Sequence, residues 1–224
     1  MDEEGVRTSK PVNVQGNTRL FANVAFGFPI ERWKSRLNVS TNIRYQDGMT
    51  VIDDLLNKTV ENGVSGRLRY DYSYNDVLEI GLMSDLSRQI ATFGLASQVD
   101  QLYFNNTYTA DMTLTILKNY SFNSAFEYLV YINKSNDFVR RLPLFNLSAS
   151  RFILKGKSGE IKLSVNNLLD RKIGVVQTTG LNYIERRQTG NLGRYVMISF
   201  IYSLNKQLNP LGMRPRGRTM RIMR

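Results

Sequence analysis

The sequence contains no cysteine and no histidine. The first absence excludes disulfide bonds and thiolate nucleophiles, and the second excludes imidazole bases. Together they remove the usual zinc ligands. The sequence also has no nucleophile–base pair and no glycine-rich phosphate loop. We therefore expect that the protein is not an enzyme and that it uses no metal and no cofactor.

Long apolar runs are missing as well. The longest apolar stretch, residues 196–204, is interrupted by Ser199 and Ser203. A membrane-spanning helix needs about 18 to 20 consecutive apolar residues, so none is expected. Residues 1–10 are polar and charged, and they lack the apolar centre of a signal peptide. We expect no export signal within this sequence.

The sequence is rich in alternation between apolar and polar residues. In residues 36–46, the apolar side is formed by Leu37, Val39, Thr41, Ile43 and Tyr45. Similar alternation returns, less regularly toward the C-terminus, in residues 19–30, 60–74, 77–90, 101–117, 121–132, 144–154, 160–169 and 194–204. Because neighbouring side chains of a β-strand point to opposite faces, this period of two predicts an all-β, antiparallel up-and-down meander of about nine long strands.

The connections between these segments alternate in length. Short connections are expected at residues 31–34, 75–76, 119–120 and 155–158, and long ones at residues 47–58, 92–100, 133–143 and 171–193. Short turns at one edge and long loops at the other are typical of outer-membrane β-barrels. The expected strands also reach the length of about 9 to 11 residues that a tilted membrane strand needs, whereas ordinary strands average about 5 to 6.

A soluble β-barrel or sandwich is the alternative interpretation, with the apolar face packed inside. Such an interior would have to hold aromatic rings from nearly every strand. The tyrosines instead suit a lipid–water boundary, where the ring is in an apolar medium and the hydroxyl is in water. The residues in question are Tyr70, Tyr72, Tyr74, Tyr108, Tyr128 and Tyr202. Some of them equally suit ordinary cross-strand packing.

Positive charge is concentrated after the last expected strand. The chain has 30 Lys and Arg against 19 Asp and Glu, a net charge of +11. Six basic residues and no acidic residue lie in the last nineteen positions, among Pro210, Gly212, Pro215 and Gly217. We interpret residues 205–224 as a basic flexible tail, residues 17–204 as the barrel portion and residues 1–16 as the remnant of an external loop.

Three short segments near the C-terminus resemble one family. They are Asn146-Leu-Ser-Ala-Ser-Arg-Phe152, Lys162-Leu-Ser-Val-Asn-Asn-Leu-Leu-Asp170 and Gly193-Arg-Tyr-Val-Met-Ile-Ser-Phe-Ile-Tyr-Ser-Leu204. These segments resemble the closing strands of TonB-dependent-receptor-like outer-membrane β-barrels. In that family an Asn-Leu-(Phe or Leu)-Asp element ends the penultimate strand, and Gly-Arg opens the last one after an external loop. The chain departs from the usual assembly signal, because the last strand runs into a tail.

The resemblance implies a location and partners. Nine strands is an odd number for a bacterial outer-membrane barrel, so we expect the chain to be the C-terminal part of a larger one. The resemblance implies a parent barrel of about 22 strands in the outer membrane of a Gram-negative bacterium. The missing parts would be the plug, the first strands and the segment that contacts TonB. The whole receptor would take up a nutrient such as a siderophore, vitamin, glycan or peptide. No nucleic acid is expected as a partner.

Charged residues on the polar face are candidates for the path of the ligand. They are Arg36, Arg44, Arg67, Arg69, Asp71, Asp85, Asp111 and Glu127. Such residues equally well solvate and cross-link a polar lumen. Asp53 and Asp54, in an expected external loop, have the ligand chemistry for a cation but also suit a solvated loop. Two other functions stay open, a barrel with a structural or adhesive role, and a soluble protein that binds nucleic acid through its basic tail.

Overall fold

The computed structural model describes residues 16–52, 55–75, 77–94, 100–171, 173–180, 183–190 and 193–204. Nine strands form the main sheet: β1 (Thr18–Ile30), β2 (Ser35–Ile52), β3 (Leu55–Tyr74), β4 (Leu78–Phe93), β5 (Gln101–Ile116), β6 (Tyr120–Asn133), β7 (Phe138–Ile153), β8 (Gly159–Asn166) and β11 (Tyr195–Tyr202). Strands β9 (Ile173–Gly180) and β10 (Tyr183–Gly190) form a separate hairpin, and η1 (Glu31–Trp33) and η2 (Lys155–Lys157) are single 3₁₀ turns.

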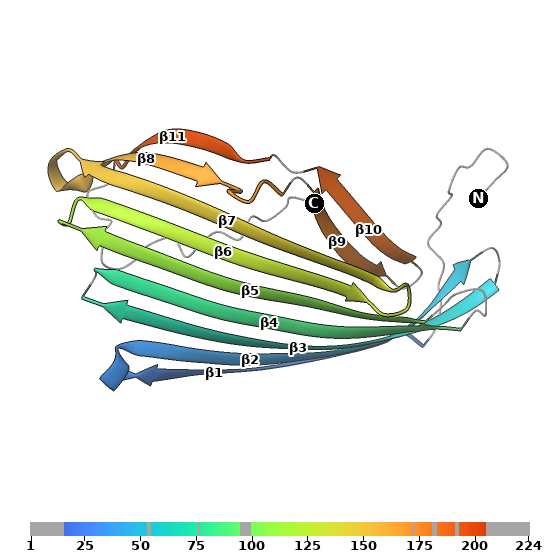
Figure 1. Cartoon of the computed structure of the whole chain (residues 1–224). Coiled ribbons are helices and arrows are strands. Elements are labelled where there is room, and N and C mark those ends of the chain that lie inside the picture. Colours follow the sequence, from blue (N-terminus) through green and yellow to red (C-terminus); the bar gives the residue numbers. More distant parts are fainter. Residues whose placement is uncertain are drawn as a thin grey trace.

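The main sheet is an antiparallel meander, as the alternation predicted. Each strand from β1 to β7 pairs with the next strand in the chain, and β8 pairs with β11 (Figure 1). β1 and β11 are the two edge strands and do not pair with each other, so the sheet is open. Among the described residues, no helix has the length and apolar character needed to cross a membrane.

The long connections differ from the sequence prediction. β2 and β3 remain paired as far as Ile52 and Leu55, so residues 47–58 are mostly strand rather than loop. β7 begins at Phe138, which shortens the expected loop at residues 133–143 to a turn. The expected loop at residues 171–193 contains the hairpin β9–β10. The prediction of long loops was wrong at residues 47–58 and 133–143, where the strands extend further than the alternation does. The connection from β8 to β11 is long, as predicted, and contains the separate hairpin.

The short connections meet at one edge, which we call the tight-turn edge. It contains the links β1–β2, β3–β4, β5–β6 and β7–β8, which lie at the left of Figure 1. Lys34 (φ 48°) and Asn75 (φ 46°) turn the chain there in the left-handed conformation. Asparagine tolerates this conformation better than most residues, whereas lysine adopts it at a steric cost.

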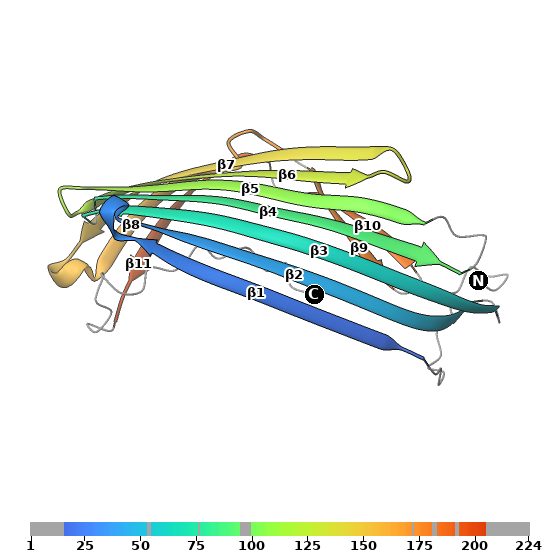
Figure 2. The same cartoon turned by 90° about the horizontal axis from the view of Figure 1, so that it is seen from below.

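The two faces of the sheet differ in chemistry. Cross-strand partners point to the same face, and one row of partners contains Phe28, Leu37, Tyr70, Leu82, Ala110, Phe126 and Phe145. We call this side the apolar face. The opposite side, the polar face, has rows such as Asn42, Ser65, Ser87 and Asn105. Figure 2 shows that the sheet is strongly curved, with β8 and β11 bent away from the plane of β1 to β5.

Burial is inverted relative to a soluble protein. Large apolar side chains are exposed along the apolar face, including Phe26 (60%), Ile43 (51%), Leu82 (48%) and Phe200 (63%). The fully buried side chains of the described residues include Asn57, Thr59 and Asn133, all three polar. Ala91, Tyr103 and Leu142 are the buried hydrophobic residues in that part of the chain. The described sheet therefore has no packed apolar core of its own.

Candidate functional site

The eight charged residues expected along a ligand path all lie on the polar face. Arg36, Asp71, Gly81 and Asp111 are successive cross-strand partners on β2, β3, β4 and β5. Arg67 pairs with Asp85 in another row of the same face. Arg44, Arg69 and Glu127 reach this face through the alternation of β2, β3 and β6. The alternation therefore assigned the correct side to every one of them, whereas their role as a ligand path stays a prediction.

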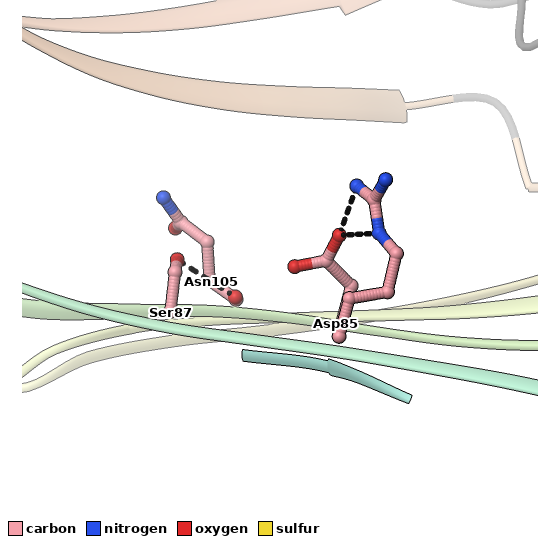
Figure 3. A network of polar contacts seen from close by, with 4 residues as sticks. Asp85, Ser87 and Asn105 are labelled. Atoms are coloured by element: carbon pink, nitrogen blue, oxygen red, sulfur yellow. Dashed lines mark hydrogen bonds and ion pairs between the residues drawn. The ribbon is translucent and has the colours of Figure 1, made fainter. Parts of the chain in front are cut away.

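The first of two charged clusters joins β3 to β4. The guanidinium of Arg67 donates two hydrogen bonds to Oδ2 of Asp85, and the one from Nε is 2.8 Å long. Two rungs away on the ladder, the Ser87 hydroxyl donates to the carbonyl oxygen of Asn105 at 3.0 Å. Figure 3 shows Asp85, Ser87 and Asn105 pointing to the same side of the ribbon, with pale orange strands from the C-terminal part across from them. The polar face thus lies inside the curve of the sheet.

The second cluster is centred on Arg69. Its guanidinium lies 2.7 Å from Oδ1 of Asp71 and 3.7 Å from Oδ1 of Asp111, which comes from β5. Asp71 and Asp111 are separated by β4, whose residue in this row is Gly81. A Cβ atom at Gly81 would lie 2.5 Å from Oδ2 of Asp111 and 2.8 Å from a guanidinium nitrogen of Arg69. The missing side chain of Gly81 therefore creates the space in which one arginine reaches two carboxylates.

The remaining candidates take less part in these clusters. Arg44 donates to Oε1 of Gln89 at 3.5 Å, and the Tyr103 hydroxyl donates to the same oxygen. Arg36 and Glu127 lie on the polar face without an ion pair to any of the described residues. Five of the eight candidates are therefore ion-paired within the sheet. The two clusters join neighbouring strands and also provide a charged surface.

A third polar group fastens the end of β8 to its neighbours. The Asn146 side chain on β7 accepts a hydrogen bond from the backbone N–H of Asn167 at 2.8 Å. The Asn167 side chain in turn accepts from the N–H of Arg171 and donates to its carbonyl. Asp170 accepts from the backbone N–H of Arg194 at 2.8 Å. We call Asn146, Asn167, Asp170 and Arg194 the β8 clamp.

The β8 clamp coincides with the motifs that carried the family resemblance. The sequence pointed to Asn167-Leu-Leu-Asp170 and Gly193-Arg194 as separate motifs and did not predict the hydrogen bond between Asp170 and Arg194. The positive φ of Asn167 (52°) and Asp170 (53°) fits the preference of Asn and Asp for left-handed turns. An Asn followed three residues later by an Asp, just after an alternating segment, was the available signal for a side-chain-supported turn.

Metal binding finds no support in the described part of the chain, where no three acidic side chains come together as ligands. Asp53 and Asp54, considered above as cation ligands, lie outside the described residues, as does the basic tail.

Comparisons with known proteins return nothing for this chain: no family model, no curated protein and no solved structure matches it. The resemblance to TonB-dependent receptors stays a prediction from three short motifs.

Proposed function

We propose that this chain is part of the wall of an outer-membrane β-barrel, with the apolar face against lipid and the polar face lining the lumen. One observation carries the proposal. Long strands expose a continuous apolar face, while ion pairs and hydrogen-bonded amides cover the inside of the curve. In water, an exposed apolar surface of this extent is unfavourable, whereas in lipid it is the expected outer surface of a barrel.

The open edges define what must complete the barrel. The backbone groups on the outer side of β1, and those of β11 away from β8, have no partner strand within the described sheet. Unpaired backbone groups in the hydrocarbon core of a membrane cost several kcal/mol each, so both edges need a strand. We propose that further strands of the same protein pair with β1 and β11 and close the barrel around a plug.

We further propose that the closed barrel is a TonB-dependent receptor that imports a nutrient ligand. The motifs of the β8 clamp and the charged clusters of the lumen face support this choice over a purely structural or adhesive barrel. Binding of nucleic acid would depend on residues 205–224, because five of the eight charged candidates on the polar face already pair with one another.

The test is membrane extraction of the intact protein. A barrel remains with outer membranes after washing with carbonate or urea, needs detergent for release, and migrates faster on a gel before heating than after it. Recovery as a dissolved monomer without detergent would overturn the membrane proposal. If the barrel is stable and its ligand uptake is unchanged when TonB is deleted, the barrel proposal is kept and the proposal of a TonB-dependent receptor is overturned.

A further inference from the structure

A depression lies at the tight-turn edge, where the apolar face ends. Its volume is about 440 Å³, and it is lined by Arg32, Trp33, Lys34, Tyr70, Tyr72 and Tyr74. The lining combines two cations with four aromatic rings and contains no acidic side chain. Two different parts of the chain form it, because the first three residues belong to the β1–β2 turn and the tyrosines belong to β3.

The tyrosines connect the depression to the apolar face. Tyr70 is the cross-strand partner of Leu37 and Leu82, and Tyr72 is the partner of Ile80. An apolar chain that leaves the depression can therefore continue along the exposed side chains of this face. Trp33 is 60% exposed and Tyr74 is 46% exposed, so their rings also offer free apolar surface at the edge.

The ammonium group of Lys34 is held in place by its neighbours. The Lys34 ammonium lies 4.5 Å from the centroid of the Tyr74 ring and donates to Oδ1 of Asn75 at 3.0 Å. The Lys34 carbonyl accepts a hydrogen bond from the backbone N–H of Ser73 at 3.1 Å, which ties the turn to β3. A positioned ammonium beside an arginine suits a phosphate group, to which a guanidinium donates two parallel hydrogen bonds.

We propose that this depression binds the headgroup of an anionic glycerophospholipid, with the phosphodiester at Arg32 and Lys34 and the acyl chains along Tyr70 and the apolar face. This inference rests on the proposed function, because it needs the apolar face to lie in lipid. Charge complementarity selects the headgroup, since two cations and no acid line the site. The adjoining apolar surface selects a lipid over a soluble phosphate.

The test uses the unequal quenching of Trp33 by two brominated lipids. Trp33 is the only tryptophan in the 224 residues. The intact protein is reconstituted into phosphatidylcholine bilayers that contain phosphatidylglycerol, with bromine on the chains of one lipid or the other. The signal lost in a Trp33→Phe variant defines the part that belongs to Trp33. We expect brominated phosphatidylglycerol to quench Trp33 several-fold more, per lipid, than brominated phosphatidylcholine.

Two variants separate the site from general attraction to a charged surface. In the double variant Arg32→Gln, Lys34→Gln, the preference for phosphatidylglycerol disappears. Arg151→Gln is the matched control, because Arg151 stacks over Tyr120 at 5.7 Å without lining the depression. That variant keeps the preference. Strand content by circular dichroism verifies that each variant is folded.

Each contrary result has a distinct meaning. Equal quenching by the two lipids, or a preference that survives in the double variant, overturns the proposed headgroup site. Neither result affects the proposal that the chain forms part of a membrane barrel. A preference removed by soluble glycerol phosphate at a concentration equal to that of phosphatidylglycerol shows that the acyl chains add no affinity, which indicates a site for free phosphate and also overturns the proposal. Absence of quenching by either brominated lipid overturns the membrane proposal itself, and the headgroup site with it.

Discussion

The carboxylate of Asp170 accepts a 2.8 Å hydrogen bond from the backbone N–H of Arg194. These residues flank the hairpin β9–β10, since Asp170 follows β8 and Arg194 precedes β11. The bond therefore holds the two ends of a long excursion together at the point where β11 begins to pair with β8, at Tyr195 and Asn166. The motif residues thus fix the register of the last strand.

Replacing Asp170 by alanine should loosen this junction. The Arg194 N–H loses its acceptor, and a lost hydrogen bond of this kind costs about 1 kcal/mol of unfolding free energy. Hydrogen exchange at the amides of Arg194 and Tyr195 should accelerate, while amides in β3 and β4 keep their rates. Asp170→Asn is the control, because it keeps Oδ1 as an acceptor. Equal effects of the two substitutions would show that charge, and not the hydrogen bond, is what matters at this position.

Gly81 permits the ion pair between Arg69 and Asp111, and Gly81→Ala should therefore disrupt it. The added Cβ would lie within 2.8 Å of both charged groups, so they must move apart. Overpacking of this kind costs about 1 to 3 kcal/mol. Urea unfolding of the protein in lipid vesicles measures the loss.

Gly66→Ala is the matched control for that experiment. Gly66 is also a strand glycine, on β3, but a Cβ there meets no atom within 4 Å. We expect Gly66→Ala to be neutral or slightly stabilising, since alanine reduces the entropy of the unfolded chain. In an Asp111→Ala background the cost of Gly81→Ala should fall, because the closest contact has been removed. An unchanged cost would contradict the assignment to Asp111.

The two faces could be predicted because they depend on local alternation, and the order of the strands followed from the short connections between successive segments. A period of two in residues 101–117 or 60–74 leaves one possible orientation of each side chain relative to its neighbours. The alternation therefore predicted directly that Arg67, Asp85 and Asp111 lie on the polar face. The ion-pair partners of these residues could not be predicted from the alternation. The ion pair between Arg69 and Asp111, for example, depends on the registers of two separate strand pairs and on the absence of a side chain at Gly81.

The missed strands have identifiable causes. Residues 173–190 contain Ile, Val and Tyr only in short groups among Thr, Gln and Arg, so the hairpin β9–β10 carries no sustained apolar alternation. Pro143 was taken as the end of a loop, yet it lies within β7 opposite Tyr128. Pairing of β7 with β8 begins only at Leu147, so the absent N–H of Pro143 leaves no gap in that ladder. A sequence does not reveal which side of a strand is free.

The ion pair between Arg67 and Asp85 should contribute little to stability. The two side chains are 57% and 27% exposed, and exposed pairs are worth about 0 to 1 kcal/mol. We expect the double variant Arg67→Gln, Asp85→Asn to unfold at nearly the same urea concentration as the parent. If these residues line the ligand path, uptake changes while stability does not. A large loss of stability would instead show that the pair is needed to hold β3 and β4 together.

The orientation of the sheet can be tested with one substitution placed on either face. Phe126 and Ala125 are neighbours on β6, the first on the apolar face beside Ala110 and the second on the polar face beside Asp111. A lysine on the lipid side near the middle of the bilayer costs about 2 to 4 kcal/mol, to which Phe126→Lys adds the loss of its contact with Phe145. Ala125→Lys places its ammonium in the lumen near a carboxylate and should be tolerated. The folding yield in vesicles and the heat-dependent gel shift show how well each of the two variants folds. If the apolar face were instead the inside of a soluble barrel, the parent and Ala125→Lys would dissolve without detergent, and Phe126→Lys would unfold because it buries an ammonium in an apolar interior.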